Sequence, residues 1–336
     1  MPYARRLHRT IRIQEKRACR DTAPEKEYRM QIYSGLDSFY SVEDTAIAIG
    51  KFDGVHRGHR KIIEELFRKT ADDMRTCIFT FDPSPETFLG IGDGRELTTA
   101  EEKRRIFQEI GIDLLVEFPF TEETASMPAE TFVTEILVKK LHAQFICAGH
   151  DLSFGKDGKG NFALLQSLGK HYGFESKMIH KLQYEGKDIS STLIRGFISE
   201  GRMEEAAACL GEPYSIRDWV VHGKRLGSAI GVPTINQLPP ADKILPPYGV
   251  YFSQVLIDGK TYKAITNIGV KPTVQADGQP NVETFLYDFE GSLYGKQAEV
   301  YLLSFRRPER KMAGLKELQK TIREDISAGR AYHGIK

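Results

Sequence analysis

The sequence predicts an α/β fold, in which a parallel sheet covered by helices is followed by a small antiparallel β-barrel with a helix packed on it. Two patterns lead to this prediction. Between residues 31 and 200, apolar runs alternate with segments of helical periodicity, which is typical of a parallel sheet with helices on both faces. After about residue 212, strand-like segments follow one another with only turn residues between them, which is typical of an antiparallel barrel.

The spacing of apolar residues places the elements of the first part. Residues 45–49 (TAIAI) form a short apolar, β-branched run that begins with a threonine, as expected for a central strand of a parallel sheet. After residue 58, Ile62, Ile63 and Leu66 recur at helical spacing between charged residues, so a surface helix is expected there. The predicted strands are 31–35, 45–49, 77–81, 114–118 and 145–148, and the predicted helices are 60–73, 99–110, 128–141, 162–172 and 191–199.

Turn residues divide the second part into strands. Asp258-Gly259 and Glu290-Gly291 are expected turns, and a last helical pattern runs from Leu315 to Ile326. The predicted elements are a helix at 203–210 and strands at 219–222, 249–257, 261–266, 282–287 and 298–303. The predicted divisions are an extension at 1–29, a first domain at 30–200, a junction at 201–213 and a second domain at 214–336.

The composition is typical of a globular protein large enough for two cores. Hydrophobic residues make up 40% of the 336 residues and charged residues 28%. No run approaches the roughly 18 apolar residues that span a bilayer, so no membrane partner is expected. The four cysteines lack metal-ligand spacing, and this scatter predicts a reducing, cytoplasmic location.

The net charge of +1 conceals an asymmetry between the first 29 residues and the rest. The first 29 hold nine Lys and Arg against four Asp and Glu, a balance of +5, and the remainder holds 38 against 42, a balance of −4. The body therefore lacks the positive charge of a polyanion binder, and no nucleic-acid partner is expected. We expect residues 1–29 to be a disordered extension, with Met30 as an alternative start. Assembly into a homo-oligomer is a separate possibility that the sequence leaves open.

The segment 50–59 (GKFDGVHRGH) carries the strongest functional signal. It lies between the predicted central strand and the helix that follows, and the N-terminus of a helix favours a phosphate. Gly54 and Gly58 lack a Cβ that would obstruct a phosphate. His56 and His59 are three residues apart, which puts them on one face of the first helical turn.

This pattern resembles the H-x-G-H superfamily of nucleotidyltransferases, which transfer the nucleotide part of ATP. The resemblance implies a Rossmann-like fold for the first domain. The longer string is similar to the adenylyltransferase module of prokaryotic bifunctional riboflavin kinase/FAD synthetases. The resemblance implies that this domain transfers the adenylyl group of ATP to FMN, giving FAD and pyrophosphate, with His56 and His59 as catalytic residues. It also implies that the loop holds the substrates through Gly50, Phe52, Asp53, Gly54 and Gly58.

Two further segments of the first domain match the same family. The segment 149–155 (GHDLSFG) implies that Asp151 and Phe154 lie near the substrate, although Leu152 and Ser153 depart from the usual family residues. The segment 189–195 (ISSTLIR) offers hydroxyl groups at a predicted helix start. The resemblance implies that Ser190, Ser191 and Thr192 bind phosphate and that Arg195 neutralises developing charge.

The second domain carries a separate nucleotide signature. The segments 223–227 (GKRLG) and 231–236 (GVPTIN) resemble the riboflavin kinase motif, with departures at Ser228, Val232 and Ile235. Thr234 and Asn236 bear oxygen and are two residues apart, so on a strand they point to one side and can coordinate Mg²⁺. The implied nucleotide-binding residues are Gly223, Lys224, Gly227, Gly231 and Pro233.

Later kinase motifs complete the resemblance, which runs in family order from about residue 31 to 330. The segment 267–273 (NIGVKPT) implies a turn beside the nucleotide through Asn267 and Gly269, and Arg307 is implied in the flavin pocket. Glu283 aligns with the catalytic base of the family. A carboxylate is needed because the ribityl hydroxyl of riboflavin is a neutral nucleophile whose proton must be accepted.

The sequence therefore predicts a bifunctional enzyme that phosphorylates riboflavin to FMN and adenylylates FMN to FAD, with Mg²⁺ on the phosphates of ATP. Two alternatives remain open. One is an H-x-G-H transferase acting on nicotinamide mononucleotide or a phosphopantetheine-like acceptor. The other is a flavin-sensing regulatory protein without catalysis, against which Glu283, Thr234 and Asn236 argue.

Overall fold

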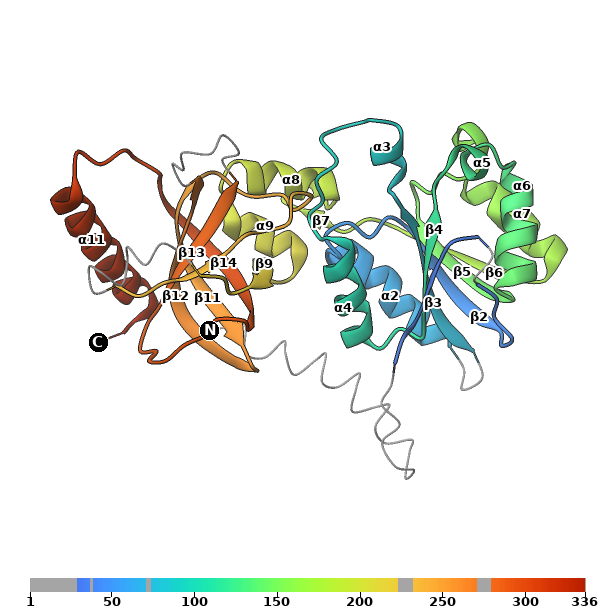
Figure 1. Cartoon of the computed structure of the whole chain (residues 1–336). Coiled ribbons are helices and arrows are strands. Elements are labelled where there is room, and N and C mark those ends of the chain that lie inside the picture. Colours follow the sequence, from blue (N-terminus) through green and yellow to red (C-terminus); the bar gives the residue numbers. More distant parts are fainter. Residues whose placement is uncertain (1–28, 37–38, 71–73, 223–231, 271–278, 336) are drawn as a thin grey trace, which may run out of the picture. The chain divides into compact units, whose positions relative to one another are not determined.

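The computed structural model describes residues 29–36, 39–70, 74–222, 232–270 and 279–335 (Figure 1). The contacts divide the chain into two units. The first consists of Met1–Gly94 and Thr98–Leu182, and the second of Arg95–Leu97 and Gln183–Lys336. Each unit is described by itself. The predicted extension, apart from Arg29, lies outside the described residues.

The first unit is built on a six-stranded sheet in which every neighbouring pair is parallel. The strand order is β1-β4-β3-β2-β5-β6, so the chain reverses its direction of travel across the sheet between β2 and β5. Ligands of such sheets bind at the carboxyl ends of the strands beside this reversal. The strands are β1 (Gln31–Ser34), β2 (Thr45–Ile49), β3 (Arg75–Asp82), β4 (Leu114–Pro119), β5 (Ala143–Gly149) and β6 (Glu175–Ile179).

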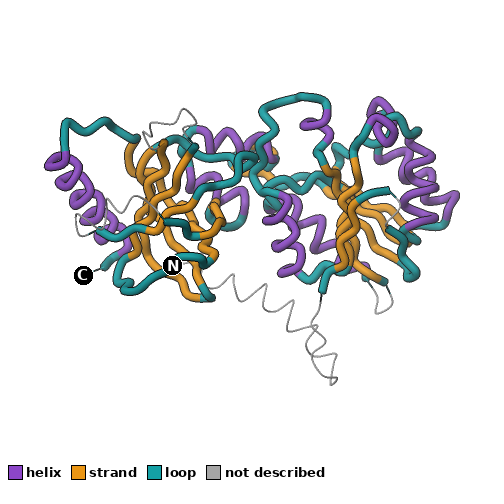
Figure 2. The backbone as a smooth tube through the Cα atoms, viewed as in Figure 1, coloured by secondary structure: helices purple, strands orange, loops and turns teal. Residues whose placement is uncertain are grey.

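Helices cover both faces of this sheet (Figure 2). On one face, Leu66 of α2 and Phe107 of α4 pack with Ile78 of β3. On the other, Phe132 of η1 and Leu165 of α7 pack with Phe79 of β3. Neighbouring residues alternate between these two cores, which explains why residues 46–49 of β2 and 77–79 of β3 are apolar without a break. The helices are α2 (Arg57–Lys69), α3 (Pro85–Phe88), α4 (Ala100–Ile110), α5 (Glu122–Ala125), α6 (Ala129–Thr131), η1 (Phe132–Lys140), η2 (Lys156–Gly158) and α7 (Phe162–Tyr172).

The second unit is a six-stranded antiparallel sheet that closes on itself. Its strand order is β10-β13-β12-β11-β14-β9, and a bridge between Val221 and Asn236 joins the two outer strands. The side chain of Gln237 also donates to the carbonyl oxygen of Asp218 across this seam (2.9 Å). The strands are β9 (Tyr214–Trp219), β10 (Ile235–Gln237), β11 (Gly249–Ile257), β12 (Lys260–Val270), β13 (Pro280–Leu286) and β14 (Gln297–Pro308).

Side chains fill the interior of the barrel. Tyr251 and Val255 are fully buried, and the hydroxyl groups of Ser253, Thr266 and Thr284 form a buried chain with spacings of 2.7 and 2.9 Å. Helix α11 (Leu315–His333) packs on the outer face, where Tyr332 stacks on Phe252. The remaining elements are the hairpin β7 (Gln183–Tyr184) and β8 (Lys187–Asp188), α8 (Ser191–Ser199) and α9 (Met203–Leu210).

The predicted fold class is confirmed, with corrections to single elements. The strand predicted at 219–222 is displaced, because β9 pairs with β14 over 214–219 and Val221 forms only an isolated bridge with Asn236. The helix predicted at 128–141 consists of the short α6 followed by the π-helix η1. Strands β6, β7, β8 and β10 were not predicted. Among the described residues, no helix is both long and apolar enough to cross a membrane.

Candidate functional sites

The loop between β2 and α2 has an unusual backbone. Phe52 and Val55 have positive φ angles of 54° and 37°, and Gly54 lies between them with a φ of 83°. Positive φ is costly for a β-branched residue such as Val55 and is typical of functional sites. The turn is held by a hydrogen bond from the Val55 N–H to the Phe52 carbonyl oxygen (3.1 Å), and by one from Arg60 Nε to the Val55 carbonyl oxygen (3.2 Å).

The two histidines of this loop stack face to face, with ring centroids 3.7 Å apart. His56 is the N-cap of α2, and its Nδ1 accepts a hydrogen bond from the backbone N–H of His59 (3.3 Å). Because Nδ1 is the acceptor, neutral His56 carries its proton on Nε2, where it can donate to a phosphate oxygen. A Cβ at Gly58 would lie 3.0 Å from the His56 ring, so glycine allows this stacked geometry.

Both histidines are held in the neutral form. Burial lowers the pKa of His56 to about 4, although the carboxylate of Asp53 opposes the shift. Burial also lowers the pKa of His59 well below its usual value, and His56 and Lys103 act in the same direction. Among the described residues, Nδ1 of His59 is buried without a hydrogen-bond partner. Around neutral pH the pair therefore offers hydrogen bonds rather than positive charge.

Phe52 and Asp53 anchor the loop through buried contacts. The Phe52 side chain is fully buried and lies between the rings of His59 (5.1 Å) and Phe107 (5.7 Å). Asp53 is 8% exposed, and its carboxylate accepts a hydrogen bond from the Thr98 N–H (3.2 Å). Gly50, also predicted in the site, donates its N–H to the Phe79 carbonyl oxygen at the end of β2 (3.1 Å).

Asp151 follows β5, the strand beside β2. Burial opposes its ionisation, but the ammonium group of Lys181 at 2.9 Å holds the pKa of Asp151 below its usual value. Charges on Asp151 and Lys181 both affect the pKa of His56, which places this ion pair at the same edge of the sheet as the histidines. Phe154 instead is buried in the core against Phe132.

The residues predicted in the segment 189–195 lie in the second unit. Ser190 is the N-cap of α8 and accepts a hydrogen bond from the Leu193 N–H (3.2 Å). Ser191 and Thr192 form the first turn of this helix. Arg195 donates from Nη1 to the carbonyl oxygen of Arg95 (2.7 Å). Since the units are described separately, the placement of these residues beside the histidines stays a prediction.

The barrel brings four predicted residues into one row. Asn236 of β10 is directly opposite Glu283 of β13, and Glu283 is directly opposite Asn267 of β12. The row continues through Val250 of β11 to Arg307 of β14. Opposite residues of an antiparallel pair point to the same face, so these side chains share the outer face of the barrel. We call Asn236, Glu283, Asn267 and Arg307 the register row.

The donor set at the first end of the row suits Mg²⁺. Asn236 is buried, and its side-chain oxygen accepts a hydrogen bond from Asn281 Nδ2 (3.4 Å). Thr234 precedes it by two residues, and Glu283 lies opposite. Amide, hydroxyl and carboxylate oxygens are the ligands that Mg²⁺ prefers. Among the described residues, no cluster of three or more His, Cys, Asp and Glu side chains could hold a metal.

The last residue of the row is tied to α11. Arg307 contacts the buried carboxylate of Asp325 through both Nε (3.0 Å) and Nη2 (2.6 Å), and Arg306 contacts the same carboxylate (2.8 Å). A bidentate pair of this kind fixes the guanidinium plane as well as its position. Nothing in the local sequence indicated Asp325, because its partners are about 18 residues away on β14.

Two groups of residues stand apart from the row. Gly223, Lys224, Gly227 and Gly231 lie outside the described residues, and the described Pro233 is exposed. Gly269 of β12 lies so close to Glu309 that a Cβ would be 2.4 Å from its carboxylate oxygen.

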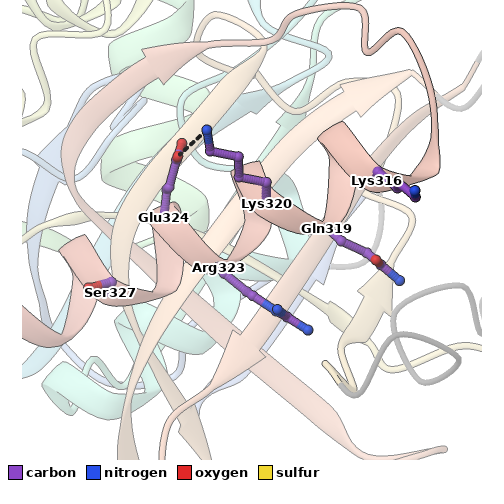
Figure 3. Close-up of a pocket in the computed structure, with 6 residues that line it drawn as sticks. All are labelled: Lys316, Gln319, Lys320, Arg323, Glu324 and Ser327. Carbon is purple, nitrogen blue, oxygen red and sulfur yellow. Dashed lines mark ion pairs between the residues drawn. The ribbon is translucent and has the colours of Figure 1, made fainter.

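The outer surface of α11 carries a shallow basic depression (Figure 3). All the side chains that line it come from this one helix, and an ion pair joins Lys320 to Glu324 (4.0 Å). No residue predicted in a site contributes to it. The lining residues are Lys316, Gln319, Lys320, Arg323, Glu324 and Ser327.

Comparisons with known proteins agree with the division into two sites. The family model described as FAD synthetase matches residues 39–193, and the model described as riboflavin kinase matches residues 210–333. A bifunctional riboflavin kinase/FMN adenylyltransferase from Escherichia coli (strain K12) is 35% identical over 296 residues, 87% of this chain and 94% of the relative. One from Pseudomonas fluorescens is 33% identical over 304 residues, 90% of this chain and 97% of the relative.

A solved structure has the same fold over most of the length of both chains. The crystal structure titled macrolide-efflux protein from Streptococcus pneumoniae has a TM-score of 0.79 and 28% sequence identity. It covers 90% of this chain and 99% of its own.

Proposed function

Because the chain belongs to the family of bifunctional riboflavin kinase/FMN adenylyltransferases, it makes FMN from riboflavin and FAD from FMN, and we propose which of its residues perform each reaction. The stacked histidines and α8 serve adenylyl transfer, and the register row serves phosphorylation. The observation that carries the second assignment is the register that aligns Asn236, Glu283 and Asn267 across three strands.

For adenylyl transfer, a phosphate oxygen of FMN attacks the α-phosphorus of ATP, and the bond to the β-phosphate oxygen breaks to release pyrophosphate. The nucleophile is already anionic, so the protein needs no general base and acts by alignment and charge stabilisation. Nε2–H of His56 and the ring of His59 donate hydrogen bonds to phosphate oxygens at the N-terminus of α2. Arg195 supplies the positive charge that the neutral histidines lack.

For phosphorylation, Glu283 accepts the proton of the ribityl hydroxyl as its oxygen attacks the γ-phosphorus of ATP and ADP leaves. Thr234 and Asn236 would hold Mg²⁺, which would neutralise phosphate charge when bound. Asn267 continues the row beside the nucleotide. Arg307, oriented by Asp325, bounds the flavin pocket.

We keep the functional boundary near residue 200, because the FAD synthetase model extends to residue 193 and so includes Ser190 to Thr192. The two units defined by contacts meet instead between Leu182 and Gln183. A cytoplasmic location and the absence of a nucleic-acid partner rest on composition alone. The oligomeric state stays open.

One assay tests the two activities and their alternatives. The purified protein is incubated with riboflavin, ATP and Mg²⁺, and the flavins are separated by chromatography. We expect FMN and then FAD. FMN alone would mean that the first site uses another acceptor, and unchanged riboflavin would favour the sensor. Omission of Mg²⁺ should abolish FMN formation.

A further inference from the structure

We propose that Lys243, a buried lysine in the loop before β11 of the kinase barrel, is a positioning residue for the other reaction, FMN adenylylation. It acts through Arg95, Glu96 and Leu97, which we call the strap. The inference rests on the proposed role of Arg195 and of the loop that carries the histidines.

The strap lies between α3 and α4 in the chain, yet its contacts place it in the second unit. Lys243 is 4% exposed, and its ammonium group donates to the carbonyl oxygen of Leu97 (2.8 Å). The same ammonium lies 4.6 Å from the centroid of the Tyr214 ring. A buried charge is tolerated only when it is compensated, and the Leu97 carbonyl oxygen and the Tyr214 ring contribute to that compensation.

Backbone hydrogen bonds hold the strap against the same loop. The Glu96 N–H donates to the Asp242 carbonyl oxygen (2.6 Å), and the Ile244 N–H donates to the Glu96 carbonyl oxygen (3.0 Å). The Tyr214 hydroxyl donates to the Ile244 carbonyl oxygen (2.6 Å), which ties this loop to β9. The strap is thus attached to the barrel on both sides of Lys243.

The ends of the strap lead to residues proposed for adenylyl transfer. At one end, the Arg95 carbonyl oxygen accepts the hydrogen bond from Arg195 Nη1 (2.7 Å). At the other, Leu97 is followed by Thr98, whose N–H donates to Asp53 in the histidine loop (3.2 Å). A displaced strap would therefore move the partner of Arg195 and the N–H that holds Asp53. Small displacements of such groups are sufficient to slow a reaction that depends on alignment.

The test is Lys243→Met, which keeps the length of the side chain and removes its charge and donor. FAD formation from supplied FMN is measured separately from FMN formation from riboflavin. We expect kcat for FAD formation to fall by about 10- to 100-fold, as for misaligned groups, and FMN formation to be unchanged. Lys243 belongs to the barrel, so a merely structural role would lower FMN formation first and would shift the unfolding of the barrel reported by Trp219 fluorescence.

Three further variants make the result decisive. Tyr214→Phe removes only the hydroxyl that anchors the loop and should reduce FAD formation in the same selective way, to a smaller extent. Lys296→Met removes a lysine that is paired with Asp258 at the surface and should change neither reaction. Arg195→Ala tests the proposed function. If it lowers FAD formation and Lys243→Met does not, the strap proposal is overturned alone. If Arg195→Ala has no effect, the role proposed for Arg195 in adenylyl transfer fails.

Discussion

Lowering the pH should destabilise the first unit through His56. Burial lowers the pKa of this side chain from 6.5 to about 4, so below pH 6.5 the unfolded chain binds more protons than the folded one. The stabilisation by neutral His56 is complete above pH 6.5 and is lost as the pH falls toward 4. This lowering of the pKa corresponds to roughly 3 kcal/mol in total, and about 2 kcal/mol of it should be lost by pH 5.

The matched variant is His56→Asn, because asparagine is a good N-cap and does not titrate. The free energy of opening is measured by hydrogen exchange of the α2 amides at about pH 7.5 and pH 5, corrected for intrinsic exchange. Wild type should lose about 2 kcal/mol more than the variant. His150→Asn, at an exposed histidine of the same unit, should behave as wild type. Equal pH dependence in wild type and His56→Asn would refute the argument that burial keeps His56 neutral.

Three further predictions concern the two reactions. Glu283→Gln should lower FMN formation by about 10²- to 10⁴-fold, the usual contribution of a general base, and spare FAD formation from FMN. The exposed Glu324→Gln serves as control, and an equal loss of both reactions would contradict the assignment. His59→Ala should do the reverse, and an unchanged rate of FAD formation would exclude this histidine from the site. Asp325→Asn should raise the KM for riboflavin and speed hydrogen exchange in α11; a change confined to exchange would leave Arg307 with a structural role only.

The spacing of apolar residues was sufficient to predict most helices and strands, because burial of one or both faces of an element determines that spacing. The strand β2 matches its predicted range, and α7 and α8 match theirs. The strand was predicted at 219–222 because Trp219, Val220 and Val221 are residue types that favour strands. The alternation of buried Tyr214 and Ile216 with more exposed neighbours marks the true strand. The edge strand β6 was missed because its residues are mostly polar or half-buried.

How much of each site could be predicted depends on how far apart its residues lie in the sequence. His56 and His59 share one helical turn, so their spacing alone placed them together. The register row joins residues up to 71 positions apart, from Asn236 to Arg307, and depends on the pairing of five strands. Family resemblance named its members, and the register shows that they lie opposite one another on neighbouring strands. Lys243 and Asp325 had no local signal, because their partners lie elsewhere in the sequence.

The packed interior of the barrel determines where its chemistry can occur. Tyr251, Val255 and the hydroxyl chain from Ser253 to Thr284 leave the inside occupied, as in other small barrels. We therefore expect the reactants to bind on the outer face, where the register row lies and where Asp325 of α11 contacts Arg307. It follows that substitutions inside the barrel should alter stability, whereas substitutions in the row, one residue away along the same strands, should alter catalysis. Thr284 and Glu283 are adjacent in the chain and provide that comparison directly.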